Sequence, residues 1–397
     1  MGNKTFKMIL TMGIIFIMLF QNFITVAAEE TDSSSLTDEE QTSVSTFELE
    51  AVKQSVIMLK DVKTAKIPIY MTQGVTISAI RTSQSNFKAE YDNDVIIVTA
   101  FNTDDYLNHC DVQLTLYIEG NDPYLISFTK EIQIMLEMET KESISEELNK
   151  EKPIDISMMS AYNRTLYLNA IDRRKIALSN RDFSDCKIAC IGDSITEGVG
   201  INNNEEILYS YPANLKHILG AEEVINLGKG GTSISSYWDS FLPMTEGIPE
   251  DTDIIIVLGG VNDCYSGNKD NMGNLENLEP GTFYGDTNFL MQDLKKRYPD
   301  SMILFVTPIS TVTNTTYLSF LPNMLPISVY AEVIKELGEE NDIPVFDVYS
   351  EEFLDSHDEE IMNRFMYDGV HPNVDGYYIL AEHIAAKLIE MEADNED

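Results

Sequence analysis

The stretch Cys186–Gly198, with the sequence CKIACIGDSITEG, decides the fold of the C-terminal half of the chain. It opens with a short run of almost continuously apolar residues, which is typical of a strand covered on both faces. A Gly-Asp-Ser turn then ends this strand. Similar apolar runs occur farther along the chain, after the first one at Lys187–Gly192: Glu223–Leu227, Ile254–Leu258, Met302–Thr307 and Val345–Val348.

Segments with a helical pattern separate these runs, near 207–219, 286–298, 327–340 and 374–391. Strands that alternate with helices predict a parallel sheet with helices on both faces. We therefore expect an α/β fold for residues 161–397, with three layers (α/β/α) around a five-stranded parallel sheet. A further helix is predicted at Tyr162–Ile176, packed on the same domain.

Residues 47–140 follow a different pattern, in which apolar and polar residues alternate. Every second residue is apolar from Val112 to Ile118, and this period of two indicates a half-buried strand. Turn residues separate several runs of this kind, so we expect a small antiparallel β-sandwich. The sequence predicts that it folds as an accessory domain, joined to the C-terminal domain by a linker at 141–160.

The first 28 residues have the features of a secretory signal peptide. Two lysines precede the apolar stretch Met8–Phe20, and small residues end at Ala28, where we expect cleavage. The stretch is shorter than the roughly 20 residues of a membrane span, which disfavours the alternative of an uncleaved anchor. The protein is thus predicted to be secreted, with no stable membrane span after cleavage. Residues 29–46 are acidic and polar, so we expect a disordered leader.

The charge balance excludes some partners. The 397 residues include 27 Lys and Arg against 66 Asp and Glu, which gives a formal net charge of −39. Binding of nucleic acid needs clustered basic residues, and this chain has no such cluster. The same acidity disfavours docking on anionic lipid. The sequence leaves the oligomeric state open.

The cysteines and most histidines do not suggest a metal or redox site. Cys186 and Cys190 fall in one predicted strand, where four residues span about 13 Å, too far for a disulfide. With Cys110 and Cys264 they are expected to be free thiols, mostly buried. No group of His, Asp or Glu has the spacing of metal ligands, so neither a metal nor a cofactor is predicted. Four histidines are expected to be structural or solvated: His109, His217, His357 and His383.

Polar residues suited to catalysis follow the predicted strands. Ser194 comes after the first strand, Gly228 lies in a glycine-rich turn after the second, and Asn262 follows the third. Asp368 and His371 come after the last. Because sites in such folds form where the strands end, we expect these residues to meet at one edge of the sheet.

Together these residues suffice for acyl transfer. The hydroxyl of Ser194 needs a base within hydrogen-bond reach, and the imidazole of His371 can serve. Asp368 lies three residues earlier, so one turn can bring its carboxylate to the imidazole. The oxyanion of the tetrahedral intermediate needs donors, for which the candidates are the backbone N–H groups of Ser194 and Gly228 and the side-chain amide of Asn262.

The segments GDSITEG, NLGKGG, GVND and DGVHP resemble blocks I, II, III and V of the SGNH (GDSL-type) hydrolase family. The four residues that name the family match Ser194, Gly228, Asn262 and His371, and Asp368 matches the Asp of its DxxH motif. The resemblance covers about 186–392. It implies a flavodoxin-like α/β/α domain and ester hydrolysis through a Ser-His-Asp triad.

A finer resemblance concerns the substrate. Thr282–Gly285 and Thr307-Pro308 resemble features of the carbohydrate-esterase-like branch of the family. The loops Cys264–Thr282 and Ser310–Asn323 are polar and lack the contiguous apolar surface of a lipase acyl channel. Trp238 fits either sugar stacking at the rim of the site or ordinary packing.

We therefore expect a serine esterase that removes acetyl or similar short acyl groups from a saccharide. One alternative is a lysophospholipase or general short-chain esterase of the same family. Another is a carbohydrate-binding or adhesion protein that acts through its β domain, and an acyltransferase is a third. The sequence does not separate water from a sugar hydroxyl as the acyl acceptor.

Overall fold

The computed structural model describes residues 49–393 with gaps at 52–54, 72–74, 93–94, 104–108, 121–127, 150–154, 202–208, 237–238 and 322. The predicted signal peptide, the predicted leader and Trp238 lie outside the described residues.

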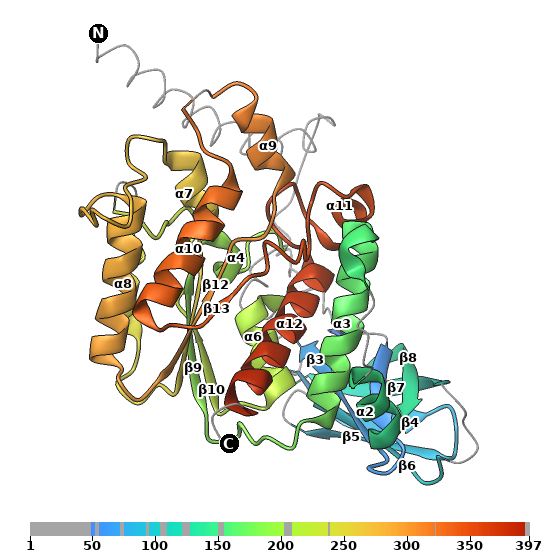
Figure 1. The fold of residues 1–397 in the computed structure, drawn as a ribbon. Helices are drawn as coiled ribbons and strands as arrows, with labels where there is room; N and C mark the ends of the chain where they lie inside the picture. Colours follow the sequence, from blue (N-terminus) through green and yellow to red (C-terminus); the bar gives the residue numbers. More distant parts are fainter. Residues whose placement is uncertain are drawn as a thin grey trace, which may run out of the picture. The chain divides into compact units, whose positions relative to one another are not determined.

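A five-stranded parallel sheet with the order β10-β9-β11-β12-β13 forms the centre of the C-terminal half (Figure 1). β9 and β11 have the predicted bounds, and all five strands are parallel, as the sequence predicted. The central strands are buried along nearly their whole length, which explains their continuous apolar runs. The strands are β9 (Lys187–Gly192), β10 (Glu223–Asn226), β11 (Ile254–Leu258), β12 (Met302–Val306) and β13 (Val345–Phe346).

Helices cover both faces of this sheet, which confirms the three-layer α/β/α fold (Figure 1). On one face α12 packs against both α3 and α6, and on the other α10 packs against α8. The long helices are α3 (Ala161–Leu178), α6 (Tyr211–Leu219), α8 (Phe283–Arg297), α10 (Ile327–Asn341) and α12 (Val374–Ala393). Short elements that the sequence did not predict are α4 (Ser194–Glu197), α7 (Val261–Ser266), α9 (Val312–Leu318), α11 (Glu359–Phe365), and the 3₁₀ turns Ile156–Met158 and Leu242–Gly247.

The strand order fixes where a site can form. The chain starts the sheet at β9, adds β10 on one side and then continues with β11 on the other. At such a reversal the connections leave in opposite directions, which opens a crevice at the carboxyl ends of the two strands. Ser194 directly follows β9, and Asn262 follows β11.

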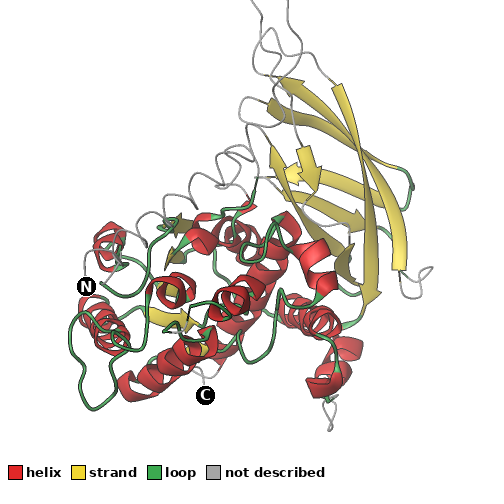
Figure 2. Cartoon of the chain, turned by 90° about the horizontal axis from the view of Figure 1, so that it is seen from above, coloured by secondary structure: helices red, strands yellow, loops and turns green. Residues whose placement is uncertain are grey.

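The N-terminal half consists of two four-stranded sheets, with the orders β1-β3-β6-β5 and β2-β8-β7-β4 (Figure 2). Burial alternates along β6, β7 and β8, as the period of two predicted. The sequence predicted an antiparallel sandwich, but one pair of strands differs: β2 runs parallel to β8. The strands are β1 (Leu49–Ala51), β2 (Ser55–Leu59), β3 (Thr64–Met71), β4 (Val75–Thr82), β5 (Phe87–Asp92), β6 (Val95–Ala100), β7 (His109–Gly120) and β8 (Phe128–Glu139).

Two ion pairs connect strand β8 to helix α3 of the C-terminal half. Arg173 pairs with Glu137 at 2.9 Å and Arg174 pairs with Glu139 at 2.8 Å, all four side chains being largely buried. The predicted linker contains helix α2 (Lys141–Leu148). The predicted boundary between two separately folding domains stays a prediction, and these ion pairs are contacts that a truncated chain would lose.

Candidate active site

Ser194 is the first residue of α4, immediately after β9. The Asp193 side chain begins this helix by accepting a hydrogen bond from the Ile195 N–H at 2.9 Å. Gly198 ends it in the left-handed conformation. This tight turn holds Ser194 half-buried at the carboxyl end of the sheet, and its backbone N–H donates no hydrogen bond within the described part of the chain.

The structure brings Ser194, His371 and Asp368 into direct contact, although 177 positions separate Ser194 from His371. His371 Nε2 lies 2.8 Å from Ser194 Oγ, and His371 Nδ1 lies 2.9 Å from Asp368 Oδ2. The loop between α11 and α12 carries the last two residues. It is closed by the Tyr367 N–H, which donates to the His371 carbonyl oxygen at 2.8 Å.

Asp368 is held as a carboxylate. Its Oδ1 accepts the backbone N–H groups of Val370 and His371, both at 2.7 Å, while Oδ2 faces the imidazole. Burial works to raise the pKa of Asp368, but the hydrogen bonds from His371 and Val370 outweigh it and leave the pKa below its ordinary value. The carboxylate can therefore orient the ring and stabilise an imidazolium at neutral pH.

Asn262 lies in the first turn of α7, after β11. Its Nδ2 donates one hydrogen bond to the Thr232 carbonyl oxygen at 2.8 Å, which fixes the amide against the glycine-rich turn. An amide nitrogen carries two hydrogens, so the second remains for a ligand. The side chain is half-buried.

The Gly228 N–H, a predicted oxyanion donor, is already engaged. It donates to Asn226 Oδ1 at 2.9 Å. A Cβ added at Gly228 would lie 2.2 Å from the Glu197 backbone nitrogen. Glycine is therefore required here for close packing against α4, and the structure does not support its use as a donor.

Gly231 of the same turn is the better candidate. Other amides of the turn donate elsewhere: Lys229 to the Gly192 carbonyl oxygen at 3.1 Å, and Gly230 to Glu197 Oε2 at 2.5 Å. Gly231 has a φ of 78° and open space where its Cβ would be, and among the described residues its N–H has no acceptor. The sequence could not distinguish the glycines, because the acceptors of the neighbouring N–H groups, Asn226 Oδ1, the Gly192 carbonyl oxygen and Glu197 Oε2, are set by the folded structure.

Asp193 combines a structural role with an unusual ionisation. Its Oδ1 accepts the Ile195 N–H, but its Oδ2 is buried and has no hydrogen-bond partner among the described residues. Burial raises the pKa of Asp193 to about 7. Near neutral pH this carboxyl is thus partly protonated inside the fold.

We predict that Asp193→Asn removes a pH-dependent loss of stability. A folded pKa of about 7 lies above the unfolded value near 4, so the wild-type protein loses stability as pH rises between these values, by about 4 kcal/mol. Asparagine keeps the Oδ1 acceptor but does not titrate. Denaturant unfolding at pH 5 and pH 8 measures the part of this loss above pH 5, about 3 kcal/mol; the same pH dependence in both proteins contradicts the assignment.

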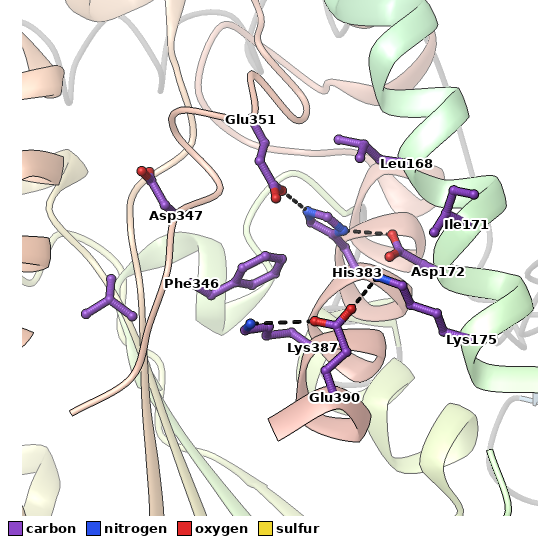
Figure 3. Close-up of a pocket in the computed structure, with 11 residues that line it drawn as sticks. Leu168, Ile171, Asp172, Lys175, Phe346, Asp347, Glu351, His383, Lys387 and Glu390 are labelled. Carbon is purple, nitrogen blue, oxygen red and sulfur yellow. Dashed lines mark hydrogen bonds and ion pairs between the residues drawn. The ribbon is translucent and has the colours of Figure 1, made fainter. Parts of the chain in front are cut away.

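A second cluster of ionisable residues lines a cavity of about 290 Å³ between α3, α12 and the segment after β13 (Figure 3). His383 Nδ1 lies 2.7 Å from Asp172 Oδ2, and His383 Nε2 lies 2.6 Å from Glu351 Oε2. Its ring stacks on Phe353, with centroids 4.0 Å apart. Ser194 and His371 do not line this cavity.

Most charged side chains in this cavity pair with one another, and Asp347 pairs with Lys335 outside it. Lys175 and Lys387 both pair with Glu390 (Figure 3). Burial works to lower the pKa of His383, but hydrogen bonds to Asp172 and Glu351 outweigh it and raise the pKa to about 9. His383 is therefore a structural imidazolium, consistent with its predicted role, and it links α12 to α3.

We predict that His383→Gln destabilises the protein at pH 7 by about 3 kcal/mol and removes one component of its pH dependence. The folded pKa of about 9 exceeds the unfolded value near 6.5, so this stabilisation is complete below pH 6.5 and lost as pH rises through 9. Denaturant unfolding from pH 6 to 10 measures it. The exposed His109→Gln is the control, and equal curves for both variants contradict the assignment.

All four cysteines are free, as expected, and three of them are buried. Burial raises the pKa of Cys186, the partly exposed one, to about 11, so its thiol is unreactive at neutral pH. Within the described ranges, no group of three metal-binding side chains is placed to hold an ion. None of the helices described there has the length and apolarity to cross a membrane.

A parallel α/β/α sheet with a serine, a histidine and an aspartate in contact at its carboxyl edge is the architecture of an acyl-transferring hydrolase. Residues 190–379 match the GDSL-like lipase/acylhydrolase family. This region belongs to that family, which makes it an ester-hydrolase domain.

Solved structures resemble about half of the chain. A protein from Lactobacillus plantarum is 26% identical, with 53% of this chain and 98% of that one covered and a TM-score of 0.44. A lipase/acylhydrolase from Enterococcus faecalis is 20% identical, with coverage of 52% and 96% and a TM-score of 0.38. Est24, a carbohydrate acetylesterase from Sinorhizobium meliloti, is 16% identical, with coverage of 52% and 100% and a TM-score of 0.37. No curated protein matches the chain.

Proposed function

We propose that the protein is a secreted serine esterase that hydrolyses short acyl esters, above all acetyl esters, on carbohydrate. Ser194 is the nucleophile, His371 the base and Asp368 the residue that orients the base. The observation that carries this proposal is the continuous contact from Ser194 Oγ to His371 Nε2 at 2.8 Å and from His371 Nδ1 to Asp368 Oδ2 at 2.9 Å.

In the first step Ser194 Oγ attacks the ester carbonyl carbon, and its proton passes to His371 Nε2. Asp368 accepts a hydrogen bond from Nδ1–H, which presents Nε2 as the acceptor and stabilises the imidazolium. The carbonyl oxygen becomes an oxyanion. Ser194 N–H, Gly231 N–H and the free hydrogen of Asn262 Nδ2 are its donors.

In the second step the tetrahedral intermediate collapses to an acyl-enzyme. His371 gives its proton to the leaving alcohol oxygen, so the alcohol departs neutral. A water molecule then attacks the acyl carbon, His371 takes a proton from that water, and Ser194 Oγ leaves with the proton that His371 returns. The products are the alcohol and a carboxylic acid.

We predict that Asn262→Ala lowers kcat about 10²–10³-fold with a smaller effect on KM, because this donor acts mainly on the transition state. Steady-state kinetics on a small acetyl ester measures the split. The control is Asn277→Ala, an exposed asparagine in the following loop. A change in KM alone assigns Asn262 to substrate binding and removes it from the oxyanion hole.

Two features support a carbohydrate substrate and an extracellular location. The loops Cys264–Thr282 and Ser310–Asn323, which follow β11 and β12, are polar. The signal-like segment at residues 1–28 supports export, and protein recovered from the medium should begin at Glu29.

The substrate class is tested by a screen of the purified protein on acetylated xylan, acetylated peptidoglycan and p-nitrophenyl esters of graded chain length. We expect turnover of acetyl esters and of at least one acetylated polymer. Preference for long acyl chains supports a lysophospholipase, and activity on small esters alone supports a general short-chain esterase. No turnover of any ester contradicts the proposal.

A further inference from the structure

Three aromatic side chains form a continuous row beside the proposed active site. The rings of Tyr265 and Tyr317 meet edge to face with centroids 5.7 Å apart, and those of Tyr317 and Phe320 do so at 5.3 Å. Tyr265 and Tyr317 are half-buried, whereas Phe320 is 55% exposed. The row thus runs from the interior of the site region to the surface.

The inner end of this row is attached to the proposed oxyanion hole. Tyr265 lies three residues after Asn262 in α7, a spacing that puts both side chains on the same side of the helix. The Tyr265 hydroxyl lies 3.0 Å from Thr311 Oγ1, at the start of α9. The row therefore continues from α7 to α9 with its inner ring held in place.

Helix α9 is in turn fixed to the loop that carries Asp368 and His371. A Cβ added at Gly369 would lie 2.4 Å from Thr313 Oγ1, so the loop and the helix are in close contact. Ser356 bridges them: its Oγ donates to the Gly369 carbonyl oxygen at 2.9 Å and accepts the Val312 N–H at 2.8 Å. The row is thus held next to Asn262 through α7, and next to the loop of Asp368 and His371 through α9.

The reaction decides which part of the substrate this surface faces. His371 must protonate the leaving oxygen, so the alcohol part of the ester lies on the side of the His371 loop. An acyl chain would require an enclosed apolar channel, but the outer ring here is exposed. The exposed residues near it in the chain are three with hydroxyl groups, Thr315, Thr316 and Ser319, and one apolar residue, Leu321. Aromatic faces next to hydroxyls match a sugar ring, which has apolar C–H faces and a polar rim.

We propose that Tyr265, Tyr317 and Phe320 form a subsite in which the sugar ring of the esterified carbohydrate stacks on the leaving-group side of Ser194. This inference rests on the proposed function and adds to it the residues that select a saccharide alcohol.

The test compares two acetyl esters: a partially acetylated xylo-oligosaccharide and ethyl acetate, which has no ring. For Phe320→Ala we expect the ratio of kcat/KM for the saccharide to kcat/KM for ethyl acetate to fall about three- to tenfold, mainly through KM. Phe320→Trp restores the ratio, because a larger aromatic face replaces the lost one. Phe289→Ala on α8, 54% exposed in the wild-type protein, is the matched control.

The outcomes separate this inference from the proposed function. If wild type hydrolyses both esters and Phe320→Ala leaves the ratio unchanged, the subsite is wrong and the esterase stands. The p-nitrophenyl esters of graded chain length are assayed with the same variant. If Phe320→Ala reduces activity on them in proportion to acyl chain length, the row binds acyl chains and the sugar subsite is rejected. If wild type hydrolyses ethyl acetate but no acetylated saccharide, the carbohydrate substrate and the subsite both fail.

Discussion

Replacing Ser194 by alanine should abolish ester hydrolysis, with a fall in kcat of about 10⁴–10⁶-fold. The substitution removes the atom that forms the acyl-enzyme, and the residual rate comes from the oxyanion donors acting on a direct attack by water. The fold should be unaffected, because α4 is capped by Asp193 and not by the serine hydroxyl. Steady-state kinetics and thermal unfolding on the same preparation separate the two effects.

The control for this variant is Ser184→Ala, an exposed serine shortly before β9. It matches the chemical change and should keep wild-type activity. Turnover by Ser194→Ala close to that of the control would reject Ser194 as the nucleophile.

The second large effect is expected for Asp368→Asn, which should lower kcat about 10⁴-fold. Asparagine can still accept the Val370 and His371 N–H groups through Oδ1, so the loop keeps its shape. Its amide, however, would present a donor to His371 Nδ1. The ring would then carry its proton on Nε2, where Ser194 needs an acceptor.

Kinetics and a crystal structure of Asp368→Asn together test this explanation, with the exposed Asp300→Asn as control. The expected result is a nearly inactive enzyme with an unmoved His371. An active Asp368→Asn enzyme would mean that another carboxylate orients His371.

The parallel sheet could be predicted because its central strands are buried on both faces. β9 and β11 read as uninterrupted apolar runs, and their predicted bounds agree with the structure. The elements that were missed carry no such pattern. β1 has three residues, and helices such as α7 and α9 are too short for a helical period to appear.

Ser194, Gly228 and Asn262 could be nominated from sequence because each follows a strand, and parallel strands end at one edge. Asp368 and His371 lie between α11 and α12, and they could be nominated because a spacing of three residues lets the carboxylate reach the imidazole. The glycine that supplies an oxyanion donor could not be predicted from sequence, since this depends on which backbone N–H is free. The Gly228 N–H donates to the side chain of Asn226, two positions earlier, and this contact becomes evident only in the structure. The His383 cluster could not be predicted from sequence either, because Asp172 lies 211 positions from His383.

Covalent labelling with an activated alkyl phosphonate, read by intact mass and peptide mapping, tests directly whether Ser194 is the nucleophile. The reagent traps a nucleophilic serine as a stable analogue of the tetrahedral intermediate. We expect one adduct per chain, on the peptide that contains Ser194, in step with loss of esterase activity and absent in His371→Ala. Inactivation with the label on another residue, or full ester hydrolysis by protein that takes up no label, would contradict it.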